Sequence, residues 1–160
     1  MNQTDDLFKQ LFNHFGPALA EWLLNIPVKS ARDASGELPP IKQAIRTDYV
    51  LELTLFDDTT LLFHVEFQGR NSHRPMSWRM LEYDSRLIEQ KNLPVCSAII
   101  YLGHGAGRHD TGEHAHLCPI TQRTIVQWSY QVVHLWQWKA EDLLVLNQPV
   151  LLPLIGQTEI

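Results

Sequence analysis

The chain of 160 residues is poor in cysteine and has no long hydrophobic run. Its two cysteines, Cys96 in an apolar run and Cys118 in a loop-like segment, exclude a disulfide framework and fit a reducing compartment. No apolar run approaches the roughly 20 residues that a membrane span needs, and the first residues, MNQTDD, are polar and acidic. We therefore expect a cytoplasmic protein that is neither exported nor inserted into a membrane.

Positive charge is also scarce. Thirteen lysine and arginine residues stand against 18 aspartate and glutamate residues, for a net charge of -5. This balance works against a general attraction to phosphate backbones, so a nucleic-acid site must be a local basic patch. With 44% hydrophobic residues and no internal repeat, we expect a single domain over residues 1–160. The apolar end of the chain has no obvious stop, which suggests truncation at the C-terminus.

Two alternating apolar runs joined by a short polar turn occupy residues 46–68. With a period of two, their apolar residues fall on one face of two extended strands: Tyr49, Leu51, Leu53 and Leu55, then Leu61, Phe63, Val65 and Phe67. The pattern predicts a β-hairpin. Its opposite face carries the polar side chains of Asp48, Glu52, His64, Glu66 and Gln68. Acids on such a face need a partner.

Periodicity and helix-breaking residues predict the remaining elements. In chain order they are a helix that ends at Gly16-Pro17, a short helix over 17–24, a weak strand or irregular connection over 28–40, a helix over 76–91, a buried strand over 95–102, an aperiodic glycine- and histidine-rich segment over 103–119, a strand-like run over 125–138 and a last helix near Lys139. These elements indicate an α/β fold.

The acids Asp48 and Glu66 can hold a hard divalent cation through their carboxylate oxygens. Side chains alternate along a strand, so both acids share a face with Gln68 only if even-numbered residues pair with even-numbered residues. The turn then needs an odd number of residues or a bulge. We predict a three-residue loop within residues 56–61, with Asp48 opposite Gln68 and Glu66 diagonal.

Several phrases of the chain go together with these acids. They are DDLFKQLF, HVEFQ, RMLEYDSRL and LPVCSAIIYLG, with Arg79 and Tyr83 on the predicted helix after Glu66-x-Gln68. In this combination the chain resembles the Rpn-type, transposase-related branch of the PD-(D/E)XK nuclease superfamily. The resemblance implies a restriction-endonuclease-like core, a mixed β-sheet flanked by helices, and magnesium-dependent DNA cleavage of low sequence specificity in a protein related to mobile elements.

The resemblance also implies roles for individual residues. Asp48 and Glu66 become ligands of Mg²⁺ or Mn²⁺, and Gln68 takes the place usually held by a lysine. That lysine orients or activates the attacking water and stabilises negative charge, whereas glutamine carries no charge. We predict that Lys9 supplies the missing cation, with Arg79 as the second candidate. Asp6, or less favourably Asp5, is a candidate further metal ligand.

A phosphate-facing patch is predicted beside the acids, made of Arg70, His73, Arg74, Arg79 and Arg86. The alternative is that Glu82 and Arg86 form an i,i+4 pair and that the other side chains are only solvated.

Asp48 and Glu66 also have a structural interpretation, as strand acids paired with Arg46 and Arg70. Lys9 in turn is interpretable as a solvated helix residue.

The segment that begins at His104 contains zinc-binding residue types, namely His104, His109, His114, His116 and Cys118. Their spacing fits no compact finger, so we favour a mobile surface loop over a metal site. Trp128, Trp136 and Trp138 are suited to base stacking but are more often core or dimer contacts. Two functions stay open: a magnesium-dependent DNA endonuclease, or a catalytically degraded module of the same fold that binds DNA or a protein, with a homodimer as a further possibility.

Overall fold

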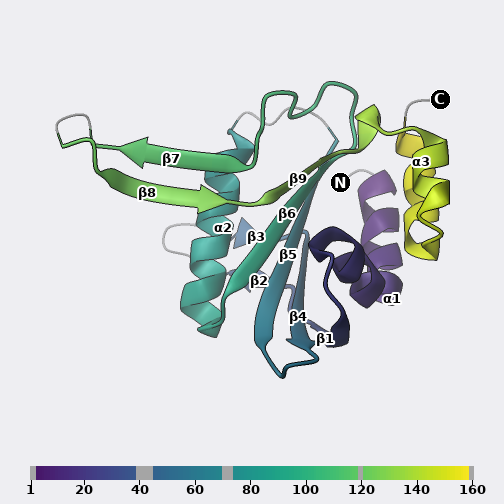
Figure 1. Ribbon diagram of the computed structural model, residues 1–160, viewed down its shortest axis with the longest axis horizontal. Helices are drawn as coiled ribbons and strands as arrows, with labels where there is room; N and C mark the ends of the chain where they lie inside the picture. Colours follow the sequence, from purple (N-terminus) through teal and green to yellow (C-terminus); the bar gives the residue numbers. More distant parts are fainter. Residues whose placement is uncertain (1–2, 39–44, 70–73, 119–120, 159–160) are drawn as a thin grey trace.

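The computed structural model describes residues 3–38, 45–69, 74–118 and 121–158, and in this description the side chains of residues 3–13, 37–38, 45–46 and 157 are not included. Helices lie on both faces of a mixed sheet (Figure 1). The elements are α1 (Gln3–Leu24), β1 (Val28–Asp33), β2 (Glu37–Leu38), β3 (Ile45–Arg46), β4 (Tyr49–Leu55), β5 (Thr60–Gln68), α2 (Met76–Lys91), β6 (Val95–Tyr101), β7 (Glu113–Leu117), β8 (Thr124–Ser129), β9 (Gln131–His134), η1 (Leu135–Gln137), α3 (Ala140–Val145) and η2 (Pro149–Gln157).

The main sheet has five strands in the order β1-β4-β5-β6-β9. β4 runs antiparallel to both of its neighbours, β1 and β5, whereas β6 runs parallel to β5 and β9 runs parallel to β6. The two parallel neighbours β5 and β6 are joined through α2, as a parallel pair requires a crossover. The predicted α/β class with a mixed sheet flanked by helices is confirmed at this level.

The two faces of the sheet pack against different helices. The odd-numbered residues of β4 and β5, such as Leu53 and Phe63, join a core cluster with Leu19 and Leu23 of α1 and with the C-terminal helices. The even-numbered face packs against α2, where Val50, Leu62 and Leu87 form a cluster. Burial of these side chains drives the layering, and it places the polar residues of β5 against α2.

The hairpin of β4 and β5 has the predicted parity. Even-numbered residues pair with even-numbered residues, for example Val50 with His64. The Leu55 N–H donates to the Thr59 carbonyl at 2.9 Å, which leaves a three-residue turn. Its last residue, Asp58, has a φ of 64°, as expected for the left-handed position of this turn type. The predicted loop length is confirmed.

The first helix is kinked where the sequence predicts a break. Phe15 has φ −116° and ψ 16°, and Pro17 lies inside the helix, where its ring clashes with the preceding turn and removes a hydrogen bond. Between them, Gly16 packs on β4, since a Cβ there would lie 2.6 Å from Tyr49 Oη and 2.8 Å from Leu51 Cδ1. The kink therefore sets the contact between α1 and the sheet.

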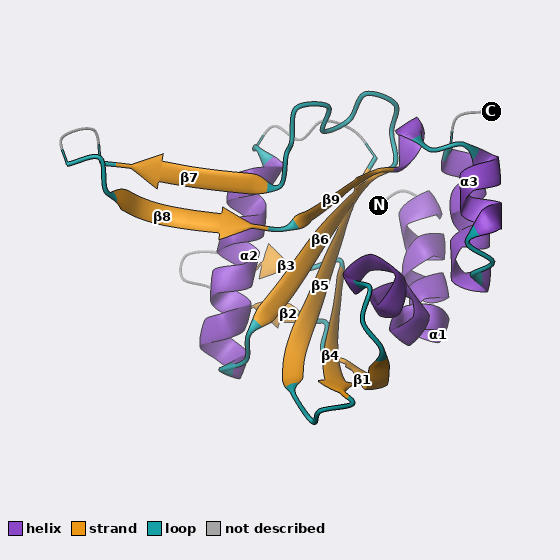
Figure 2. Ribbon diagram, viewed as in Figure 1, coloured by secondary structure: helices purple, strands orange, loops and turns teal. Residues whose placement is uncertain are grey.

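The aperiodic segment after β6 is not simply a loop, which corrects the sequence prediction. Its second half forms β7, which pairs antiparallel with β8 in a separate two-stranded sheet. These strands extend as an arm beyond the main sheet (Figure 2). Trp128 of β8 anchors the arm to α2 by donating from Nε1 to the Ser77 carbonyl at 3.0 Å. Short alternation and glycine-rich flanks conceal this hairpin in the sequence.

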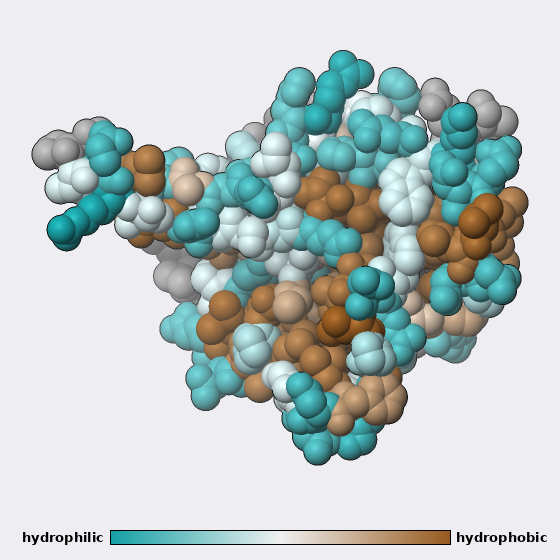
Figure 3. Space-filling view, in the orientation of Figure 1, coloured by the Kyte–Doolittle hydropathy of each residue, from teal (hydrophilic) through white to brown (hydrophobic). Residues whose placement is uncertain are grey.

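Exposed apolar side chains gather at the C-terminal helices. Figure 3 shows hydrophobic surface on the side of the molecule where α3 lies. Leu144, Val145 and Leu152 are among the exposed large hydrophobic residues. Within the described residues, no helix has both the length and the apolar character required to cross a membrane.

Candidate functional site

Asp48 and Glu66 lie next to each other at the end of the hairpin. The Asp48 N–H donates to Glu66 Oε1 at 3.0 Å, and Asp48 Oδ2 accepts the Phe67 N–H at 3.1 Å. Because Tyr49 pairs with Val65, the next position places Asp48 opposite Glu66 rather than opposite Gln68. The predicted register was therefore wrong by two residues, although the shared face was right.

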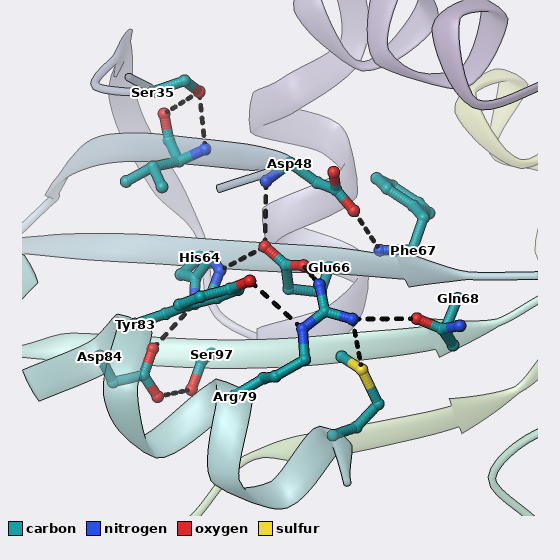
Figure 4. Close-up of polar contacts among 12 residues, drawn as sticks. Ser35, Asp48, His64, Glu66, Phe67, Gln68, Arg79, Tyr83, Asp84 and Ser97 are labelled. Carbon is teal, nitrogen blue, oxygen red and sulfur yellow. Dashed lines mark hydrogen bonds and ion pairs between the residues drawn. The ribbon is translucent and has the colours of Figure 1, made fainter. Parts of the chain in front are cut away.

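Glu66 ends a buried chain of hydrogen bonds that crosses from the sheet to α2 (Figure 4). His64 Nε2 lies 3.0 Å from Glu66 Oε1, and His64 Nδ1 lies 2.8 Å from Asp84 Oδ1 of α2. Ser97 Oγ of β6 donates to Asp84 Oδ2 at 2.5 Å. The exposed fraction of the side chain is 0% for His64 and 1% for Glu66. These hydrogen bonds hold the buried Glu66 carboxylate in one orientation.

The charge state of His64 follows from its two partners. Burial disfavours the imidazolium, but the hydrogen bonds that His64 donates to Asp84 and Glu66, together with their negative charge, outweigh burial and raise the pKa of His64 to about 9. Both ring nitrogens face carboxylate oxygens, so the doubly protonated ring donates on each side. His64 therefore supplies a buried positive charge beside Glu66 at neutral pH.

Arg79 of α2 supplies a second positive charge at the same carboxylate. Its Nη2 donates to Glu66 Oε2 at 3.2 Å, and its Nη1 donates to Gln68 Oε1 at 3.3 Å. Tyr83 also contacts the guanidinium: Arg79 Nε donates to Tyr83 Oη at 3.2 Å, and Arg79 Cζ lies 5.5 Å from the centroid of the Tyr83 ring. Arg79 thus places a cation beside the neutral side chain of Gln68.

Lys9 is the first candidate for the cation beside Gln68, and Asp6 and Asp5 are the candidate further metal ligands. Lys9, Asp6 and Asp5 lie in the first half of α1, and their side chains lie outside the described residues. Their predicted roles stay predictions.

In the predicted phosphate-facing patch, two of the arginines, Arg74 and Arg86, pair with an acid of the protein. Arg74 forms an ion pair with Glu82 Oε2, and Arg86 Nη2 lies 2.9 Å from Glu82 Oε1. Arg86 is also buried against the sheet rather than exposed. The alternative of an i,i+4 pair between Glu82 and Arg86 is confirmed. Arg70 and His73 lie outside the described residues.

In the structural interpretation, Asp48 and Glu66 are strand acids that pair with Arg46 and Arg70. Glu66 pairs with Arg79 and His64. The proposed partners Arg46 and Arg70 have no described side chains.

The histidines and tryptophans of the arm pack on one another. Trp128 stacks on His114 with ring centroids 5.1 Å apart, and Trp78 stacks on His116 at 4.8 Å. Trp138 contacts Trp22 edge to face at 5.6 Å, so these tryptophans make internal contacts. Where side chains are described, no three histidine, cysteine, aspartate or glutamate residues are arranged to hold a metal ion.

Two residues of the site escaped identification from the sequence. Asp84 lies on α2 and reaches His64 only because α2 packs on the sheet, whereas Ser97 of β6 pairs with His64 across the sheet and donates to Asp84. The one available signal was His64 itself, a polar residue on the inward face of a strand, where a polar group requires a partner.

Comparison of the chain with protein-family models, with curated proteins and with solved structures found no match.

Proposed function

We propose that this protein is a metal-dependent nuclease that hydrolyses phosphodiester bonds of DNA at the site formed by Asp48, Glu66, Gln68 and Arg79. Three features support the proposal: the element order, the paired acids and the cation beside Gln68. Each is an observation about described residues, and the resemblance to the Rpn-type branch of the PD-(D/E)XK superfamily adds the reaction class.

The element order supports a restriction-endonuclease-like core. A helix, three antiparallel strands, a second helix and a parallel strand follow one another as α1, β1, β4, β5, α2 and β6, with the short β2–β3 pair inserted. Asp48 and Glu66 then fall where the central hairpin ends, beside the carboxyl ends of the parallel strands. Such edges are common ligand sites in α/β sheets.

Asp48 and Glu66 offer carboxylate oxygens as ligands for one hard divalent cation. Carboxylate oxygens are the ligands that Mg²⁺ prefers. Glu66 Oε1 accepts from Asp48 and His64, and Glu66 Oε2 accepts from Arg79; each carboxylate oxygen has two lone pairs with which it can accept or coordinate. When bound, the metal lowers the pKa of a coordinated water and neutralises charge on the leaving oxygen.

The observation that carries the proposal is the position of Arg79 between Gln68 and Glu66. A guanidinium cannot accept a proton at physiological pH, so Arg79 does not act as a general base. It can stabilise negative charge on a phosphate in the transition state. Gln68 accepts from Arg79 and thereby fixes the guanidinium at the end of β5.

Nicking of supercoiled plasmid tests this proposal. We expect cleavage by the wild-type protein with Mg²⁺ or Mn²⁺, none with EDTA, and none in Asp48→Ala or Glu66→Ala. Asp57→Ala, an exposed acid in the hairpin turn, is the matched control and retains cleavage. Metal-dependent cleavage that persists in both site variants would place the activity elsewhere.

The second candidate is a nuclease-fold module without catalysis that binds DNA or a protein. The observation in its favour is the set of protein donors around Glu66, because His64, Arg79 and the Asp48 N–H balance the carboxylate without any metal. In that case the wild-type protein binds DNA but fails to cut it with either metal.

A further inference from the structure

Arg108, in the loop after β6, and Arg123, just before β8, are the arginines without an ion pair among the described side chains. Arg32, Arg74, Arg79 and Arg86 each form an ion pair with a glutamate. Arg108 lines a surface hollow of about 630 Å³ together with His104, Gly105, Gly107, His109 and Asp110. The hollow therefore offers a permanent positive charge to a ligand.

The loop is held firmly from its inner side. Trp136 Nε1 donates to the Ala106 carbonyl at 3.0 Å, and His134 Nε2 donates to the Gly107 carbonyl at 2.6 Å. Gly107 has a φ of 61°, and a Cβ there would lie 2.2 Å from the Tyr101 ring. These contacts fix the backbone of the loop, while the side chains of His104, Arg108 and His109 are exposed. Rigidly positioned surface loops commonly carry binding residues.

The one acid of the hollow is already balanced by internal donors. The hydroxyls of Tyr101 and Tyr130 donate to Asp110 at 2.6 Å and 2.9 Å, and the Gly112 N–H donates at 3.0 Å. His114 Nε2 lies 3.3 Å from Asp110 Oδ1. Because these donors offset its charge, Asp110 opposes an incoming anion less than an unpaired carboxylate would.

The loop that forms the hollow follows β6, which pairs with β5, the strand of Glu66 and Gln68. Tyr101 pairs with Gln68 across β6 and β5, and the Leu102 N–H donates to the Gln68 carbonyl at 2.9 Å. The loop leaves the sheet one residue later and arches over the ends of the strands (Figure 2). The loop of the hollow therefore begins two residues after the strand partner of Gln68.

We propose that this hollow binds the phosphodiester backbone of DNA, with Arg108 as the charged contact and with the His104 and His109 rings as additional N–H donors. This inference deepens the proposed function, since the same DNA strand would pass Glu66. A guanidinium suits phosphate because its planar donors match two phosphate oxygens. The net charge of -5 makes such a local cation necessary for DNA binding.

Fluorescence anisotropy with a labelled DNA duplex in EDTA tests the hollow apart from cleavage. We expect Arg108→Gln to weaken binding about tenfold and to lower the slope of log Kd against log salt concentration by about one. His104→Asn with His109→Asn weakens binding further. Lys91→Gln removes one exposed charge at the far end of α2 and is the matched control, with no change expected.

The possible results separate this inference from the proposed function. Binding that depends on Arg108, without any metal-dependent cleavage, would sustain the hollow and reject the nuclease. Metal-dependent cleavage, with equal DNA affinity in wild type and Arg108→Gln, would sustain the nuclease and reject the hollow as a DNA site. The inference would be overturned if the protein did not bind DNA, or if inorganic phosphate displaced DNA at an equal concentration of phosphate groups. It would also be overturned if the protein bound an acidic protein but not DNA.

Discussion

His64 Nε2 lies 3.0 Å from Glu66 Oε1 with both side chains buried. The opposite ring nitrogen contacts Asp84 at 2.8 Å, so one imidazolium bridges two carboxylates from the sheet and from α2. Such a partner holds a buried acid in place, whereas removing the partner would leave a buried charge without compensation. The same contact therefore serves the stability of the fold and the orientation of a candidate metal ligand.

Stability should fall at mildly alkaline pH because of His64. The pKa of His64 is raised from 6.5 to about 9 in the folded protein, so its contribution is fully present below pH 6.5 and is lost as pH rises through about 9. The loss should be on the order of 3 kcal/mol in the free energy of unfolding. Urea denaturation between pH 6 and pH 9.5 measures it.

The control for that prediction is His64→Gln, which keeps an amide donor but does not titrate. Its stability should be lower at pH 6 and nearly flat across the same window. Burial raises the pKa of Tyr49 and Tyr101, so both proteins should lose stability above pH 10. An equal slope between pH 6.5 and pH 9 in both proteins would remove His64 as the cause.

Arg79→Gln should reduce metal-dependent cleavage by roughly 10²–10³-fold, mainly in kcat, because the charge that stabilises the transition state is lost. Arg32→Gln is the control, since Arg32 is an arginine of an exposed ion pair with Glu52 on the edge of the sheet. Single-turnover cleavage of a labelled duplex gives the cleavage rates of the two variants. Equal rates in the two variants would assign the cation to another residue, with Lys9 the first to examine.

Gly16→Ala should destabilise the protein by about 1–3 kcal/mol, as expected for overpacking at a closed contact. The new methyl group would press on Tyr49 Oη and Leu51 Cδ1, both of which belong to buried residues. Gly36→Ala meets nothing within 4 Å and should change stability by less than about 0.5 kcal/mol. Thermal unfolding of the two variants decides whether the kink of α1 is packed as described.

Trp128→Ala should release the arm while the main sheet stays intact. The substitution removes the stack on His114 and the hydrogen bond to the Ser77 carbonyl. Amide hydrogen exchange in β7 and β8 should accelerate by about tenfold or more, with β5 and β6 unchanged. Ile125→Ala, on the same arm but exposed, should leave the exchange of both sheets as in wild type. Uniform acceleration would mean that the arm and sheet unfold together.

The sequence predicts those features of the fold that depend on local periodicity. The helix over 76–91 and the parity of the hairpin follow from spacing and turn chemistry, and both are confirmed. The exact register of Asp48 against Glu66 does not follow, because it depends on which three residues form the turn, here residues 56–58. A pattern of alternation fixes which face a residue occupies, but it does not fix its cross-strand neighbour.

The partners of the charged residues were harder to predict than the elements. Arg86 has the spacing of a surface residue, yet packing of α2 buries it beside Glu82. Arg79 in contrast reaches Gln68 across 11 positions of the chain. Such long-range pairs arise from tertiary packing, so a list of basic residues cannot distinguish a DNA-facing arginine from one that neutralises a glutamate.

Calorimetric titration of the protein with Mn²⁺ tests most directly whether Asp48 and Glu66 form a metal site. One site per chain is expected, with the affinity reduced at least about tenfold in Asp48→Asn and in Glu66→Gln, because each substitution removes a charged oxygen ligand. Asp57→Asn should bind as wild type does. Absence of a binding heat in the wild-type protein, or equal affinity in all four proteins, would contradict the metal-dependent nuclease proposed for this hairpin.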